Sequence, residues 1–244
     1  MEIDQIIAKA RQMCYEVAPA ELRDAVLRIV PQTRLPPLLG GETNCYGYTS
    51  PSLDLHLHHT FADWDGQRGP VIVLGHLNIE RDFPHRTVNK MLGTTLHELA
   101  HCLEWPSLFR PREYNHRLIR TEALKIAQAV SHNEEGDGTT PPWTTHEARF
   151  MRIAYHLRYR AARLNYDIRP NEVYSSERFG MSLAAEYSRA LDAEAENCID
   201  WIFRDVCNRP FPLLFERIYE RDKANWFRKQ SHSKGNQNEF NILT

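Results

Sequence analysis

The sequence lacks the features that define several large classes of protein. It has no apolar run near the roughly 20 residues that a membrane helix requires. Its start, MEIDQIIAKARQ, carries acidic residues and lacks the basic start followed by an apolar run that a signal peptide has. Lys and Arg (30) nearly balance Asp and Glu (32), so no overall charge favours nucleic acid or anionic lipid. We therefore expect a cytoplasmic protein that does not bind membranes.

Paired cysteines are also absent. The five cysteines are odd in number and scattered, and none forms a C-x-x-C pair of the kind found in zinc ribbons and redox sites. They are interpreted as reduced thiols, in agreement with a cytoplasmic location. Hydrophobic residues at 42% and charged residues at 25% are average for a globular protein, and 244 residues are enough to bury a core.

The pattern of apolar residues predicts an α+β fold with a small antiparallel sheet. Helical spacing favours one or two helices between about residues 3 and 30. Alternation in SLDLHLHH predicts a half-buried strand from Leu53, and the run VIVLGHLNI predicts a second strand at residues 71–79. Further helices are expected at about residues 87–105, 116–130, 145–164, 182–196 and 211–227. Residues 1–229 are expected to form a single domain, followed by a flexible polar tail at 230–244.

The segment LHELAH carries the strongest chemical signal. His97 and His101 are four residues apart, so on a helix both imidazoles project from one face and can bind one metal ion. Glu98 lies beside them, where its carboxylate can accept a proton from a metal-bound water. A nearly opposite stripe, expected to face the core, consists of Leu92, Leu96, Leu99 and Leu103. The motif predicts a catalytic Zn²⁺ site with Glu98 as general base.

A catalytic zinc usually has three protein ligands, so a third must be found. His146, in the segment HEARF, begins the apolar face of a predicted helix and therefore points toward whatever that helix packs on. Glu122, on the following helix, is the alternative that the gluzincin pattern would supply. Glu104 and Ser107 stand where the metzincin pattern needs Gly and His, which excludes that class. We favour His146 and keep Glu122 as the alternative.

With these two segments identified, the sequence resembles the SprT-like family of zinc metallopeptidases. That family has a His-Glu-x-x-His helix and a later His-Gly-x-x-Phe/Trp segment, to which HELAH and HEARF correspond. Glu147 stands where Gly is usual, the interval between the segments is rather long, and the zinc ribbon often found in the family is absent. The resemblance covers roughly residues 50–165. It implies a zincin-like α+β fold, a peptidase with Glu98 as general base that acts on a protein or peptide substrate, and action near DNA as in some relatives. The N-terminal and C-terminal helices have no counterpart in the family and are expected as additions to this fold.

The helix that starts near His146 also carries a basic stripe: Arg149, Arg152, His156, Arg160 and Arg163. A phosphate backbone is one partner for such a stripe. A solvated face paired with acidic residues is the favoured interpretation, because charge runs on helices are usually of this kind. Nucleic acid is therefore the less favoured partner.

Three further sets of residues bear on the expected cleft. The strand VIVLGHL is expected to be the edge strand that binds extended substrate, with Gly75 and His76 near the cleft. Candidates for stabilising an oxyanion are Tyr155, Tyr159 and Tyr174. A histidine cluster that is expected to face the surface or the cleft consists of His56, His58 and His59.

The competing hypothesis is a nucleic-acid-associated or scaffold protein that binds zinc only for folding. A purely structural site needs no general base and usually fills the fourth position with Cys or His. Glu98 therefore favours an enzyme. Cys102, next to His101, is the cysteine close enough to supply a fourth ligand, but on the helical wheel it points away from that histidine.

Overall fold

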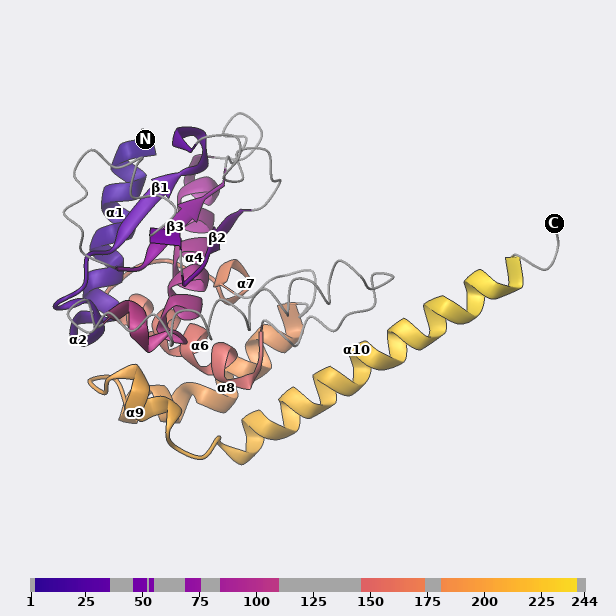
Figure 1. The fold of residues 1–244 in the computed structure, drawn as a ribbon. Helices are drawn as coiled ribbons and strands as arrows, with labels where there is room; N and C mark the ends of the chain where they lie inside the picture. Colours follow the sequence, from indigo (N-terminus) through magenta and orange to yellow (C-terminus); the bar gives the residue numbers. More distant parts are fainter. Residues whose placement is uncertain are drawn as a thin grey trace.

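The computed structural model describes residues 3–35, 46–51, 53–54, 69–75, 84–109, 146–173 and 181–240. These residues form a mostly helical structure with one small sheet, which agrees with the predicted α+β class (Figure 1). The first half contains α1 (Ile3–Val17), α2 (Pro19–Leu22), β1 (Arg28–Pro31), η1 (Gln32–Arg34), β2 (Gly47–Thr49), β3 (Val71–Leu74) and α4 (Pro84–Leu103). The second half contains η4 (Pro106–Phe109), α6 (Ala148–Arg163), α7 (Pro170–Val173), α8 (Met181–Asn197), α9 (Phe203–Cys207) and α10 (Leu213–Phe240).

The sheet has the strand order β1-β3-β2. β2 pairs antiparallel with β3, but β1 pairs parallel with it, so the prediction of an antiparallel sheet is wrong for one of the two pairings. A β-branched run such as VIVL predicts a strand. It does not predict the direction of the neighbouring strand, which depends on how the chain connects them.

β1 lies within the stretch for which the sequence predicts helices. α1 and α2 account for that stretch only as far as Leu22. The four residues of β1 are all buried. A short strand covered on both faces has no period-two alternation, so periodicity alone does not distinguish it from a buried helical segment.

Leu53 and Asp54 open the segment predicted as a half-buried strand. Both have helical conformation and both are buried, so that prediction is wrong at these two positions. One Asp54 carboxylate oxygen accepts a hydrogen bond from the Gly69 backbone N–H, 3.3 Å away. The rest of the predicted strand, which includes the histidine cluster at 56–59, lies outside the described residues, as does His76.

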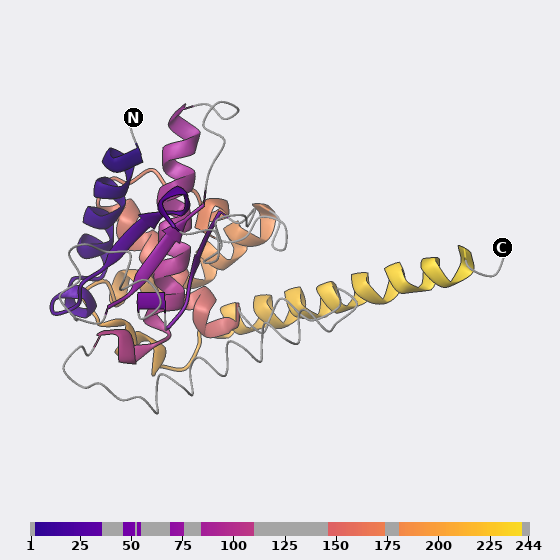
Figure 2. The same cartoon turned by 45° about the horizontal axis from the view of Figure 1, so that its top comes forward.

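Helices α1 and α4 pack on one face of the sheet (Figures 1 and 2). Ile29, Ile72 and Leu74 point into the main core on that side, whereas Val30 and Val73 belong to a second cluster on the other face. The predicted leucine stripe of α4 is confirmed as a core face, since all four leucines are buried: Leu92, Leu96, Leu99 and Leu103. The two histidines of α4 lie outside this stripe, on the side of the helix that faces Phe150 of α6.

Four of the later helices correspond to predicted ones. α4, α6 and α8 lie within three residues of the predicted limits, and α10 begins near residue 211 but runs on to Phe240. The prediction of a flexible tail from residue 230 stays a prediction. The helix expected at 116–130, which contains Glu122, lies outside the described residues. Within the described parts, none of the helices is apolar over the length that a membrane span needs.

Candidate metal centre

The structure brings together the three histidines that the sequence singles out. His97 and His101 project from α4, and His146 lies just before Glu147, the N-cap residue of α6. The Nε2 atom of His146 is 3.1 Å from His97 Nε2 and 3.3 Å from His101 Nε2. Among the described residues, these three form a group whose nitrogens are all close enough to bind one ion. The site is therefore built from two segments, α4 and the start of α6, which pack on each other.

Hydrogen bonding does not account for both short contacts of His146. A ring nitrogen carries either one proton or one lone pair, so Nε2 of His146 can make one well-aligned hydrogen bond but not two. Burial lowers the pKa of His101 to about 3, so its ring is neutral at ordinary pH and has a lone pair to offer. Imidazole nitrogens that converge in this way, each with a lone pair, are the arrangement that a metal ion requires.

Aromatic packing and hydrogen bonds orient these rings. Phe150, one turn into α6, contacts all three histidines, with ring centroids 4.2 Å from His101, 4.7 Å from His146 and 4.9 Å from His97. His97 Nδ1 lies 2.7 Å from the carbonyl oxygen of Val173 in α7. His101 Nδ1 faces a carboxylate oxygen of Glu104 at 3.5 Å. The nitrogens of His97 and His101 that do not converge are thus turned toward oxygens.

Glu98 lies between α4 and the sheet. Its side chain is 6% exposed, and burial raises its pKa to about 8. A Cβ atom at Gly47 of β2 would lie 3.3 Å from Glu98 Cγ, so the glutamate packs directly on that strand. A carboxylate with a raised pKa is suited to accept a proton near neutral pH.

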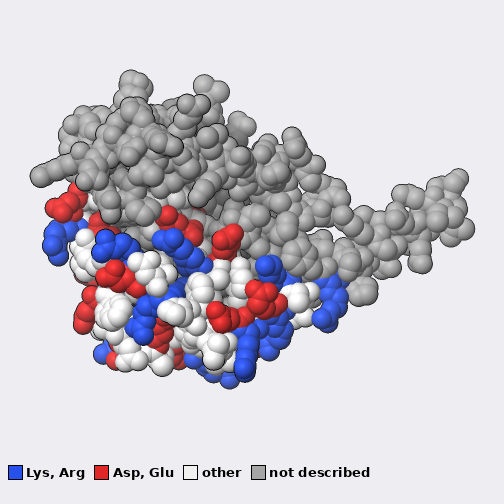
Figure 3. All heavy atoms as spheres, turned by 60° about the horizontal axis from the view of Figure 1, so that its bottom comes forward, with Lys and Arg blue, Asp and Glu red and all other residues white. Residues whose placement is uncertain are grey.

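The basic stripe of α6 is not a solvated face. Arg152, His156 and Arg160 are buried, whereas Arg149 and Arg163 are exposed. The favoured interpretation, a solvated face paired with acids, is wrong about solvent for these three residues, because α6 is covered on several sides by α1, α4, α7, α8 and α9. Its pairing with acids is confirmed for Arg152, which forms an ion pair with Glu194. A phosphate backbone cannot reach the three buried members. On the described part of the face in Figure 3, basic and acidic side chains are intermingled.

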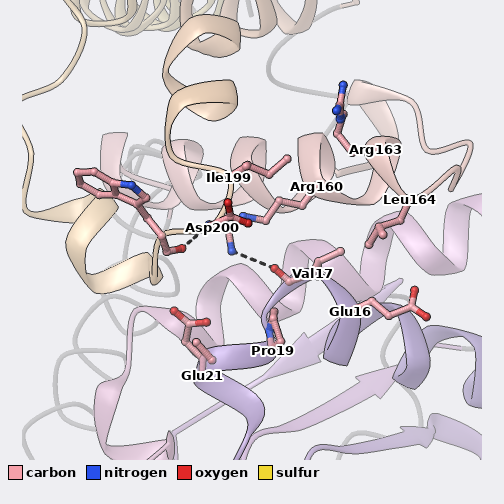
Figure 4. A pocket seen from close by; sticks show the side chains of 11 residues that line it. Glu16, Val17, Pro19, Glu21, Arg160, Arg163, Leu164, Ile199 and Asp200 are labelled. Atoms are coloured by element: carbon pink, nitrogen blue, oxygen red, sulfur yellow. Dashed lines mark hydrogen bonds between the residues drawn. The ribbon is translucent and has the colours of Figure 1, made fainter.

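Arg160 shows how such a side chain is used inside the fold. It reaches from α6 and donates a hydrogen bond to the carbonyl oxygen of Val17 (Figure 4). It also donates to the carbonyl oxygens of Cys198 and Trp201. It thereby joins the end of α1 to the turn between α8 and α9, beside a cavity of 320 Å³. Its guanidinium also stacks over Phe203, 4.3 Å from the ring centroid. The role of Arg160 is structural.

Two of the three tyrosine candidates for the oxyanion role make hydrogen bonds to α8 instead. The hydroxyl of Tyr155 donates to Asp192, and that of Tyr159 donates to Glu196, both on α8. Tyr174 lies outside the described residues. These two contacts turn the hydroxyls of Tyr155 and Tyr159 toward α8, and the prediction for Tyr174 stays a prediction.

The expected substrate strand is also misplaced. β3 lies between β1 and β2, so both of its edges are already paired. Gly75 donates its backbone N–H to the carbonyl oxygen of Tyr46 at 2.7 Å, which extends the pairing toward β2. The strand beside Glu98 is β2, and among the described strands nothing pairs with its outer edge.

The sequence does not predict the groups that face the Nδ1 atoms of His97 and His101. The partner of His97 is the backbone carbonyl of Val173. Every residue type carries such a carbonyl, so the identity of the residue does not predict this contact. In the sequence, Glu104 serves only to exclude the metzincin pattern. Its spacing of three residues from His101 places both side chains on the same side of the helix, which is a signal for this contact.

No family model matches the sequence, and neither a curated protein nor a solved structure matches it. Function is therefore inferred from the chemistry of the site itself.

Proposed function

We propose that the protein is a zinc-dependent metallopeptidase of the zincin type, similar to the SprT-like family. The observation that carries the proposal is the convergence of the Nε2 atoms of His97, His101 and His146, with a buried glutamate adjacent to His97 in sequence. Two nitrogens bound to one tetrahedral zinc at 2.0–2.1 Å lie about 3.3 Å apart. The separations of 3.1 and 3.3 Å agree with that value.

The donor set favours a catalytic ion over a structural one. Three histidines leave the fourth position of a tetrahedral zinc open, and a zinc ion in such a site supplies a Lewis acid and a water that ionises near neutral pH. Cys102 does not close the site, because its sulfur lies 3.3 Å from the hydroxyl of Thr49 and burial raises its pKa to about 12. A scaffold protein would have no use for a base at this position.

Glu98 is the general base in this proposal. Its carboxylate accepts the proton of the attacking water and passes it to the departing amine of the cleaved peptide. Burial raises the pKa of Glu98 to about 8, within about one unit of neutral pH, and keeps bulk water away from the proton. The position of the base is set by its packing on Gly47.

An extended peptide is the substrate that suits the surroundings. β2 lies beside Glu98 and is the outer described strand of the sheet on that side, so a peptide in extended form can pair with it as a further strand. Main-chain pairing of this kind binds peptides with little regard to sequence. We therefore propose unfolded or extended protein segments as substrates.

The test combines metal content with proteolysis. The purified protein should contain close to one zinc per chain, and His146→Ala should lose it. Glu98→Gln should retain zinc but fail to cleave a fluorescently quenched casein, whereas Glu147→Gln should cleave normally because Glu147 is exposed. A wild-type protein that binds no zinc would refute the proposed metal site. Cleavage of casein by Glu98→Gln would refute the assignment of Glu98 as the general base.

A further inference from the structure

A one-turn helix far along the chain contacts the first metal ligand. α7 ends at Val173, whose carbonyl oxygen lies 2.7 Å from His97 Nδ1, although the two residues are 76 positions apart. A carbonyl oxygen only accepts hydrogen bonds, so a contact this short requires a proton on Nδ1. In a neutral ring the lone pair is then on Nε2, which is the nitrogen that faces His146. The contact selects the tautomer that can bind a metal.

Gly93 makes the contact geometrically feasible. It lies four residues before His97 on α4, so both residues occupy the same side of the helix. A Cβ atom at Gly93 would lie 2.6 Å from the carbonyl oxygen of Glu172, 2.6 Å from its Cβ and 2.8 Å from its carbonyl carbon. Two of these three atoms are backbone, so α7 itself would have to move. α7 can approach α4 this closely only because residue 93 has no side chain.

α7 has its own anchors, so the contact is not incidental. Val173 and Ile168 are buried, and the Ile168 carbonyl accepts a hydrogen bond from Arg158 of α6 at 3.1 Å. A carboxylate oxygen of Glu172 accepts the backbone N–H of Arg169 at 2.7 Å, which closes the first turn of α7. The segment is thus fixed to α6 on one side and to α4 at Gly93 on the other.

We infer that Gly93 and the Val173 carbonyl act as a positioning pair that sets the tautomer and orientation of His97 for metal binding. The inference deepens the proposed function and rests on it for the identity of the metal. Neither residue touches the ion or the substrate. Oxygen partners of metal-binding imidazoles raise the basicity of the ring and fix its direction, and their loss typically weakens metal binding 10- to 100-fold.

The experiment compares two glycine-to-alanine variants in the full-length protein. Gly93→Ala should weaken zinc affinity about 10- to 100-fold, measured by competition with a chromogenic chelator. Gly69→Ala is the matched control, since a Cβ there would lie 2.2 Å from the carbonyl oxygen of Val26, a backbone contact that involves none of the histidines. The control should lose stability but keep the zinc affinity of the wild type.

A second readout uses the metal-free protein. Long-range ¹H–¹⁵N spectra should show the His97 Nδ1 proton, hydrogen-bonded and protected, in the wild type and its loss or exchange broadening in Gly93→Ala. Equal zinc affinity of Gly93→Ala and wild type, or an equal loss in both variants, would overturn the inference. A wild-type spectrum in which His97 is protonated on Nε2 would also overturn the inference. This outcome does not depend on whether Gly93→Ala folds. Failure of the wild type to bind zinc, with the Nδ1 proton present, would reject the proposed function and leave the positioning pair intact.

Discussion

The substitution Arg152→Met tests whether the basic residues of α6 belong to the core. Arg152 is fully buried, and its Nε donates to both carboxylate oxygens of Glu194 at 3.1 Å. Its Nη1 donates to the carbonyl of Arg209 at 2.8 Å, and its Nη2 donates to the carbonyl of Pro210 at 3.0 Å. One side chain thus joins α6 to α8 and to the connection between α9 and α10.

The expected loss of stability follows from what the substitution leaves behind. Methionine fills most of the volume but leaves Glu194, whose side chain is only 9% exposed, without its main counter-charge. Removing one partner of a buried ion pair lowers the free energy of unfolding by about 3–5 kcal/mol. That is a large share of the roughly 5–15 kcal/mol by which a domain is stable.

Urea unfolding, followed by far-ultraviolet circular dichroism at pH 7 with a chelator present, measures this loss without a contribution from metal. Arg163→Met on the exposed side of the same helix should change stability by less than about 0.5 kcal/mol. The double variant Arg152→Met/Glu194→Gln should recover part of the loss, because the unpaired charge is then gone. A loss below about 1 kcal/mol for Arg152→Met, as for an exposed pair, would refute the description of this contact as a core interaction.

Three further outcomes are expected. Gly47→Ala places a Cβ 2.6 Å from Thr94 Cγ2 and 3.3 Å from Glu98 Cγ, so the Glu98 side chain should shift. The value of kcat should then fall about 10- to 100-fold at unchanged zinc content, and Thr94→Ser should restore part of it. An unchanged kcat would contradict this prediction. Zinc at 100 times its Kd should stabilise the wild type by about 2.7 kcal/mol in thermal or urea unfolding and should not stabilise His146→Ala. Burial lowers the pKa of His156 in the folded state, and the nearby charges of Arg160 and Arg152 lower it further, although Glu194 at 3.4 Å raises it. As the pH falls below 6.5, the unfolded chain therefore takes up a proton at His156 before the folded protein does. Stability of the metal-free protein should therefore decrease from pH 7 to pH 5 more steeply in the wild type than in His156→Phe, and parallel profiles would show that the ring titrates freely.

The sequence predicted best those features that depend on local spacing. HELAH lies on a helix whose leucines are buried, as its periodicity indicates, and the apolar face that begins at His146 turns that residue toward α4. The basic stripe was misjudged because periodicity treats charged residues as exposed, whereas a helix covered on several sides buries some of them in pairs. β1 was missed because a strand buried on both faces shows no alternation. The pairing of β3 and the carbonyl of Val173 depend on long-range packing and have no signature in local sequence.

The spread of the histidine site along the chain has a consequence for the order of folding events. His101 and His146 are 45 positions apart, and His97 and Val173 are 76 apart, so the complete site forms only when α6 and α7 have docked on α4. Contacts between such distant segments form late, because the closure of long loops precedes them. A nascent or partly folded chain that presents only HELAH has two of the three nitrogens and binds the ion weakly. For the proposed metal site, we therefore expect tight uptake of the ion only after tertiary structure is complete, and we expect the bound ion to act mainly by slowing unfolding rather than by speeding folding.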